Sequence, residues 1–230
     1  NVLVELTATR RAGMHRYTYP PTDAANIILD LAHRDKVTDS GLRITGPTTI
    51  VGWRRSQAWA KDQLVFFAAE FSQPFTEFGI AVDDKLRQGQ KEADGKNLKA
   101  YFRFNASSGA PVLLKVGISA TSIDGALLNL AAEIKGWDFD AVRLAASQAW
   151  ETELRKIEVS GGSETQLKNF YTALYHTMTA PNLFMDVDGQ YRGRDFKNHQ
   201  ASGFENYTVF SLWDTFRAAH PLYTIIDQKR

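Results

Sequence analysis

The stretch Leu98-Lys-Ala-Tyr-Phe-Arg-Phe-Asn-Ala106 alternates between two kinds of side chain. Every second residue is apolar (Leu98, Ala100, Phe102, Phe104 and Ala106), and the residues between them include Lys99, Arg103 and Asn105. Because successive side chains of a β-strand point to opposite faces, this spacing places the apolar set on one face. The stretch therefore predicts a strand with one face in a core and the other toward water.

Further short apolar runs surround this strand within the first 135 residues: Val2 to Ala8, Met14 to Tyr19, Ile27 to Leu31, Leu42 to Ile44, Leu64 to Phe71 and Val112 to Ile118. We expect the last run to pair with the 98–106 strand across Ser107-Ser108-Gly109. The charged stretch 83–97 is interpreted as an exposed hairpin loop. Many short strands at this spacing predict an antiparallel sandwich or barrel, assigned to residues 1–136 and incomplete at its start.

The apolar period changes to that of a helix after residue 137. The residues Val142, Ala145, Ala149, Trp150, Leu154 and Ile157 form one stripe, with Asp138 or Asp140 as the N-cap. Ser163 and Gln166 have the spacing of a capping box, and apolar residues follow at helical spacing from Leu167 to Met178. We therefore assign residues 137–181 to a helical connector.

The last part of the chain, residues 182–230, is interpreted as the truncated beginning of a further, helical domain. A polar loop is expected over 182–205. A third helix is expected over 206–219, ended by Pro221 because proline removes a backbone donor.

Composition limits the classes of function. The 230 residues hold 27 basic and 26 acidic side chains, a formal net charge of +1. Nucleic-acid binders normally carry a clear basic surplus, so no nucleic-acid partner is expected. The absence of cysteine excludes disulfides, thiol nucleophiles and thiolate metal sites. No apolar run approaches the ~20 residues of a transmembrane helix, so no membrane span is expected.

Both ends of the sequence resemble cuts through a longer polypeptide. The chain begins inside the strand-like run Asn1-Val2-Leu3-Val4 and shows neither an initiator methionine nor a signal segment. It ends at Arg230, directly after an apolar run, without a closing element. We therefore expect a fragment whose partner is the remainder of the same polypeptide.

An acidic turn, Asp186-Val187-Asp188-Gly189, partly matches a calcium-binding loop. Aligning Gly189 with the sixth position of an EF-hand puts Phe184 at the first position, where a carboxylate is required. The EF-hand interpretation therefore fails. The sequence instead favours an aspartate-stabilised turn, because Asp side chains accept hydrogen bonds from nearby backbone amides. No metal ligand is assigned in this segment.

Trp213 and Asp214 form the most suggestive pair of functional residues. An indole face can cover the C–H groups of a sugar, and a carboxylate can accept hydrogens from its hydroxyls. The pattern equally allows a core tryptophan and an intrahelical ion pair between Asp214 and Arg217. Trp53 and Trp59 could form a second sugar platform, although core or edge packing explains them as well.

Several ordered stretches together resemble glycoside hydrolase family 92. They are Leu6 to Tyr17, Trp59 to Gln63, Glu70 to Phe75, Lys115 to Ser119, Gly136 to Asp140, Trp150 to Ile157, Phe170 to His176, Pro181 to Phe184, Asp186 to Gly193, Tyr207 to Arg217 and Ala219 to Pro221. The matches keep their order along nearly the whole chain. A chance similarity would not be expected to do so.

The resemblance implies a two-part enzyme, in which a mutarotase-like antiparallel β-sandwich and a helical linker precede a catalytic (α/α) barrel. It implies that residues 182–230 hold the first helix of this (α/α)6 barrel. It implies an inverting, calcium-dependent exo-α-mannosidase that removes terminal mannose from mannose-containing oligosaccharides, with α-1,2 linkages expected. Inversion requires a general acid and a general base with carboxyls ~6.5–9.5 Å apart. The resemblance also implies a secreted or periplasmic bacterial protein.

The resemblance assigns substrate binding in this chain to Trp213 and Asp214, with the segment Gly193-Arg-Asp195 as a weaker candidate. It implies that the acid, the base and most Ca²⁺ ligands lie beyond the segment, so no catalytic residue is assigned here. The isolated chain is therefore predicted to be inactive.

Two alternatives remain open from the sequence. The first is a non-catalytic carbohydrate-binding or scaffolding sandwich module. The second is a mutarotase-like enzyme, which would need a His/Glu pair inside the sandwich. Residues 1–135 contain only His15 and His33, neither in a recognisable pair.

Overall fold

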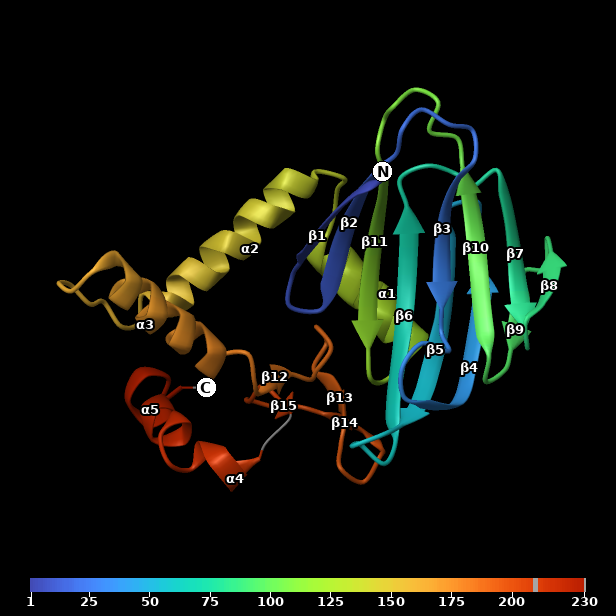
Figure 1. Ribbon diagram of the computed structural model, residues 1–230. Helices are drawn as coiled ribbons and strands as arrows, with labels where there is room; N and C mark the ends of the chain where they lie inside the picture. The colour runs from blue at the N-terminus through green and yellow to red at the C-terminus, as the bar shows by residue number, and fades with distance from the viewer. Residues whose placement is uncertain (209–210, 230) are drawn as a thin grey trace.

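The computed structural model describes residues 1–208 and 211–229, which form a β-sandwich followed by helices (Figure 1). The larger sheet has the order β1-β2-β11-β6-β5-β4-β9, with β1 Leu3–Ala8, β2 Ala12–Thr18, β11 Val112–Ser119, β6 Gln63–Phe71, β5 Thr49–Gln57, β4 Lys36–Ile44 and β9 Glu92–Asp94. The smaller sheet has the order β3-β10-β7-β8, with β3 Ala25–Asp30, β10 Leu98–Phe104, β7 Glu77–Val82 and β8 Lys85–Gln88. All of these strand pairs are antiparallel, so the predicted sandwich is confirmed.

The strand predicted from the 98–106 alternation is β10, and its apolar face is buried as expected. The predicted pairing of this strand with the run Val112 to Ile118 is wrong. β10 lies between β3 and β7 of the smaller sheet, whereas β11 lies between β2 and β6 of the larger sheet. Phe104 and Val112 are both fully buried in one core, which they enter from opposite sheets. Alternation determines which face of a strand is buried, but it does not determine the neighbouring strand.

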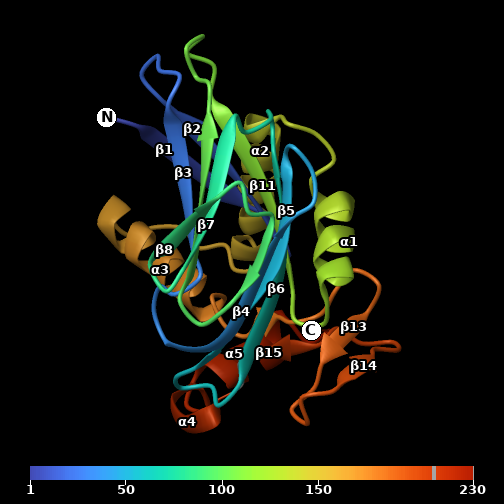
Figure 2. The ribbon, with the colours of Figure 1, turned by 90° about the vertical axis from the view of Figure 1, so that its right-hand side faces the viewer.

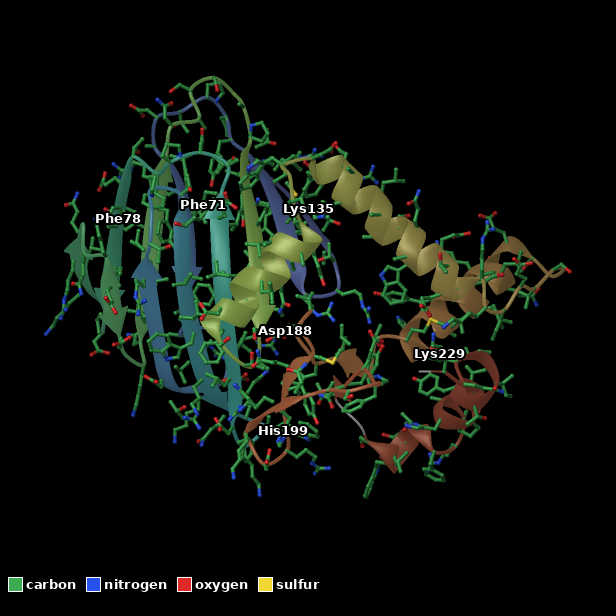
Figure 3. All side chains as sticks on the ribbon, turned by 180° about the vertical axis from the view of Figure 1, so that it is seen from behind. Phe71, Phe78, Lys135, Asp188, His199 and Lys229 are labelled. Atoms are coloured by element: carbon green, nitrogen blue, oxygen red, sulfur yellow. The ribbon has the colours of Figure 1, made fainter. Side chains whose placement is uncertain are left out.

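The core between the two sheets is rich in aromatic rings. The ring of Phe102 lies 5.5 Å from that of Phe71 and 5.3 Å from that of Phe75, and Phe71 lies 4.9 Å from Phe104. Phe71 comes from the larger sheet and Phe102 from the smaller one, so their contact joins the two sheets. Figure 3 marks Phe71 and Phe78 on the sandwich.

A helix that the sequence analysis missed, α1 (Ile123–Glu133), covers the outer face of the larger sheet (Figure 2). Residues up to about 135 were expected to be mainly strands, and this expectation is wrong here. Gly117 of β11 allows the close packing, because a Cβ there would lie 2.4 Å from the carbonyl oxygen of Ala126. The local signal was the N-cap Ser122, whose Oγ accepts from the amide of Gly125 at 2.9 Å.

The two helices of the connector are confirmed. Helix α2 (Phe139–Leu154) starts at the N-cap Asp138 and leaves the sandwich beside β1 and β2 (Figure 1). Helix α3 (Glu164–Thr177) has the predicted capping box between Ser163 and Gln166. Trp150 of α2 and Tyr175 of α3 have ring centroids 4.7 Å apart.

The segment after α3 differs from the expected loop and long helix. It contains two small two-stranded antiparallel sheets, β12 (Asn182–Leu183) with β15 (Tyr207–Thr208), and β13 (Gln190–Arg192) with β14 (Asn198–Gln200). Two short helices follow, α4 (Leu212–Thr215) and α5 (Ala219–Ile226).

The prediction of one helix over 206–219 is therefore wrong. Val209 and Phe210, which belong to this predicted helix, lie outside the described residues. Pro221 does not end a helix but lies in the first turn of α5, where a backbone N–H has no intrahelical partner to lose. The charged stretch 83–97 also differs from a plain loop, since β8 and β9 lie within it. Among the helices of residues 1–208 and 211–229, none is long and apolar enough to cross a bilayer.

Candidate functional site

Trp213 and Asp214 both lie on α4 and both face solvent. The side chain of Trp213 is 84% exposed, and Leu212 and Phe216 beside it are also largely exposed. Within residues 211–229, no ion pair joins Asp214 to Arg217; the Arg217 guanidinium lies 5.4 Å from the centroid of the Phe216 ring. An exposed indole next to an exposed carboxylate is available to a ligand, and clustered exposed apolar groups mark interaction surfaces.

The segment that leads to α4 is attached to the sandwich through a buried carboxylate. Asp186 begins the predicted turn, since its carbonyl accepts from the amide of Gly189 at 3.0 Å, and Asp188 Oδ1 stabilises the turn by accepting from the amide of Gln190 at 3.0 Å. The side chain of Asp186, however, is only 3% exposed. Asp186 accepts from Ser119 Oγ at 2.7 Å and from Asn129 Nδ2 at 2.7 Å. Ser119 belongs to β11 of the sandwich, and Asn129 belongs to the helix α1 that covers it.

Two arginines from the β1–β2 turn hold the same segment from the other side. Arg11 Nη1 lies 2.8 Å from Glu133 of α1, and its Nε donates to the carbonyl of Met185 at 2.6 Å. Arg10 pairs with Glu205 at 2.8 Å. Burial opposes ionisation of Glu133, but hydrogen bonds from Thr9 and Arg11 outweigh it, so the pKa of Glu133 is lowered. A cavity of about 80 Å³ lies at this junction.

A second attachment joins the tip of the β5–β6 hairpin to β13. Asp62 Oδ1 accepts from Arg55 at 2.6 Å, and its Oδ2 accepts from Arg192 Nη2 at 2.7 Å. The Arg192 side chain is only 9% exposed and also lies over the ring of Phe196. The hydrogen bond from Arg55, followed by the bond from Arg192, lowers the pKa of Asp62 well below its usual range.

Removing the charge at this attachment should destabilise the protein at neutral pH. We expect Asp62→Asn to lower the free energy of unfolding by about 1–2 kcal/mol at pH 7, because it leaves the buried Arg192 without its carboxylate. The folded pKa of Asp62 is depressed, so its stabilisation is complete above the unfolded value of about 3.9 and is lost as the pH falls below it. Urea unfolding of both proteins at pH 7 and pH 3 should show the gap shrinking in acid.

The control for this prediction is Asp84→Asn. Asp84 pairs with Lys99 at 2.9 Å at the surface, where an ion pair contributes less than about 1 kcal/mol. A gap between wild type and Asp62→Asn that stays constant from pH 7 to pH 3 would contradict the prediction.

The weaker candidate segment, Gly193-Arg-Asp195, lies in the β13–β14 hairpin. Asp195 accepts a hydrogen bond from His199 Nε2 at 2.9 Å, and this bond is the main reason why the pKa of Asp195 is lowered. The His199 ring lies 5.5 Å from that of Tyr191. Figure 3 shows His199 near the end of the hairpin, below the sandwich. The group is exposed, and its contacts are local to the hairpin.

The two tryptophans of the sandwich differ in their environment. Trp53 lies against Gly41, where a Cβ would come within 2.2 Å of its ring, and its Nε1 donates to Asp39 at 3.2 Å. Trp53 therefore has a packing role. Trp59, on the β5–β6 connection next to the Asp62 attachment, is 82% exposed.

The described residues provide no metal centre of their own. Within residues 1–208 and 211–229, no three or more acidic or histidine side chains gather where they could hold an ion together. Both oxygens of Asp186, the most buried carboxylate among the described residues, already accept hydrogen bonds from neutral side chains. Calcium ligation by these residues alone does not fit their arrangement.

The chain matches two family models in sequence. Residues 1–119 match the glycosyl hydrolase family 92 N-terminal domain, and residues 125–230 match the glycosyl hydrolase family 92 catalytic domain. A curated protein of Arthroderma benhamiae, named an uncharacterized secreted glycosidase, is 37% identical over 205 residues. That match covers 78% of this chain and 27% of the fungal protein.

Solved structures show the same similarity in three dimensions. A family GH92 α-mannosidase from Bacteroides thetaiotaomicron is 38% identical, with a TM-score of 0.93 over 99% of this chain and 32% of that chain. The same mannosidase has also been solved in complex with mannoimidazole. An inverting GH92 mannosidase of that organism is 27% identical, with a TM-score of 0.85 over 95% of this chain and 30% of that one. The chain thus spans about a third or less of the length of these relatives.

Proposed function

The chain belongs to glycosyl hydrolase family 92, and on that basis we propose that it is part of an inverting, calcium-dependent exo-α-mannosidase. The observation that carries the proposal is the 38% identity, over 99% of the chain, to a structure described as an α-mannosidase. The proposed substrates are mannose-containing oligosaccharides, with α-1,2-linked terminal mannose favoured. The mannoimidazole complex of that relative supports a mannose-like ligand.

In this proposal the chain supplies three parts of the enzyme. Residues 1–136 form the N-terminal sandwich, 137–181 the helical linker, and 182–230 the start of the catalytic (α/α) barrel. The remainder of the same polypeptide is the necessary partner. The general acid and base lie outside this segment, so the isolated chain is inactive.

Trp213 and Asp214 are the proposed substrate-binding residues of this segment. The exposed indole would cover the C–H face of the terminal mannose, and the carboxylate would accept hydrogens from its hydroxyls. Both side chains are on the surface of α4 and Asp214 is not tied into an ion pair with Arg217, which supports these roles.

Calcium in the proposed enzyme would be held mainly by residues outside this segment, because the described residues gather no ligand set. A hard cation prefers oxygen ligands such as sugar hydroxyls. A secreted or periplasmic location is proposed as well. The name of the Arthroderma benhamiae relative supports secretion, and a bacterial source is part of the proposal only.

The proposal is tested with the longer protein that contains this chain. Incubation with α-1,2-mannobiose should release mannose, and proton NMR at early times should show the β-anomer first, as inversion requires. The isolated 1–230 chain, assayed in parallel, should release none. Absence of mannose release by the longer protein would reject the mannosidase, and binding of mannose by the isolated sandwich would then favour a carbohydrate-binding module.

A further inference from the structure

Asp186 is a buried carboxylate whose hydrogen-bond partners are all neutral. Its Oδ2 accepts from Ser119 Oγ at 2.7 Å and from Thr121 Oγ1 at 2.5 Å, and its Oδ1 accepts from Asn129 Nδ2 at 2.7 Å. An unpaired buried charge is costly unless every oxygen is satisfied. Here three donors from the sandwich side are directed at one side chain from the catalytic segment.

The first turn of α1 adds to this pocket. Ser119 is the last residue of β11, Thr121 lies in the connection from β11 to α1, and Asn129 lies within the helix. Gly125 makes room for the carboxylate, because a Cβ there would lie 2.4 Å from Asp186 Oδ2. The positive end of the helix dipole further favours a negative charge at this place.

The backbone on both sides of Asp186 is fixed to the same surface. The carbonyl of Met185 accepts from Arg11 Nε at 2.6 Å, and the amide of Val187 donates to Asn129 Oδ1 at 2.9 Å. Asn129 therefore contacts two consecutive residues of the segment, through its amide nitrogen and its amide oxygen. Residues 185–187 cannot shift without breaking contacts with both the β1–β2 turn and α1.

This anchored segment is joined directly to the strand that precedes α4. Asn182 and Leu183 of β12 pair with Thr208 and Tyr207 of β15. The amide of Phe184 donates to the carbonyl of Asn206 at 2.9 Å, and Asn206 Nδ2 donates back to the carbonyl of Phe184 at 2.9 Å. Figure 1 shows β12 and β15 side by side between the sandwich and α4.

We propose that Asp186 is a positioning residue for the substrate-binding helix α4. By fixing β12 to the sandwich, it fixes β15, the strand that precedes α4 in the sequence. The inference rests on the proposed function, because it assigns to Asp186 the placement of residues that bind mannose there. It gives the sandwich a role in the site although the site itself lies on the catalytic side of the chain.

The test uses Asp186→Asn in the longer protein, with Asp188→Asn as the matched control. Asp186→Asn keeps the shape of the side chain but replaces one acceptor oxygen by an NH₂ group, which faces hydrogen-bond donors and cannot accept from them. We expect kcat/KM for α-1,2-mannobiose to fall at least about tenfold when it is measured well below the melting temperature of the variant. Asp188 is exposed, and the hydrogen bonds of its side chain go to Gln190, two residues later, so its variant should keep wild-type kinetics.

One further readout and a second variant separate positioning from simple stabilisation. Amide hydrogen exchange in peptides covering residues 211–216 should be faster in Asp186→Asn and unchanged in Asp188→Asn. Thr121→Val, which removes one donor and keeps the side-chain shape, should change both readouts in the same direction by a smaller factor. It remains informative if Asp186→Asn folds poorly.

The outcomes are distinct. If the melting temperature of Asp186→Asn falls while kcat/KM and exchange in 211–216 stay as in wild type, the residue is only structural and the inference is wrong. If the wild-type protein releases no mannose, the proposed function fails. In that case the exchange experiment still decides whether Asp186 controls α4.

Discussion

Replacing Asp214 by asparagine in the longer enzyme should lower kcat/KM for α-mannosides by about 100-fold. A carboxylate that accepts hydrogens from sugar hydroxyls makes charge-assisted hydrogen bonds, which are roughly twice as strong as neutral ones. Asparagine keeps the size of the side chain but loses the charge and one acceptor. A loss of about 2.7 kcal/mol of transition-state stabilisation corresponds to this factor.

The stability of this variant should not change. Asp214 is exposed on α4 and makes no ion pair with the nearby Arg217, so its charge does not hold the described fold together. The matched control is Asp23→Asn, an exposed aspartate in the sandwich that should keep full activity. Trp213→Ala should weaken binding of mannoimidazole as well. Wild-type kcat/KM in Asp214→Asn would exclude this carboxylate from the substrate site.

Truncating Phe102 to alanine should destabilise the sandwich by about 3–5 kcal/mol. Phe102 is fully buried, and its ring contacts Phe71 of the opposite sheet and Phe75. Removing it loses the transfer free energy of the ring and leaves a cavity that a close-packed core cannot refill completely. Since whole domains have only about 5–15 kcal/mol of stability, the variant should be close to unfolding at 37 °C.

Urea unfolding followed by circular dichroism measures this effect as a lower midpoint. The control is Leu86→Ala, an exposed residue of β8 whose loss should cost less than about 0.5 kcal/mol. A cost below about 1 kcal/mol for Phe102→Ala would show that the two sheets do not depend on the aromatic core between them.

Local patterns in the sequence predicted elements well where the deciding contacts are local. The alternation around Phe102 predicted which face of β10 is buried, and Ser163 with Gln166 predicted the start of α3, because a capping box joins residues three apart. The same reasoning failed for strand pairing. β10 and β11 are adjacent in sequence, yet each completes a different sheet.

The support of the candidate site could not be predicted for a related reason. Asp186 meets Ser119, 67 residues earlier in the chain, and Asp62 meets Arg192, 130 residues later. Neither contact can be inferred from the spacing of residues that are close in sequence. Trp213 and Asp214 could be proposed because the stretch around them resembles a family motif, whereas the contacts that attach residues 182–208 to the sandwich became visible only in the fold.

The central claim, that this chain belongs to a calcium-dependent α-mannosidase, is tested most directly by mannose release from α-1,2-mannobiose with and without a chelator. The longer protein should release mannose, lose that activity when EGTA removes calcium, and regain it when calcium is added back in excess. Mannose release that is unaffected by complete chelation would contradict the calcium requirement. No release under any calcium concentration would contradict the enzyme itself.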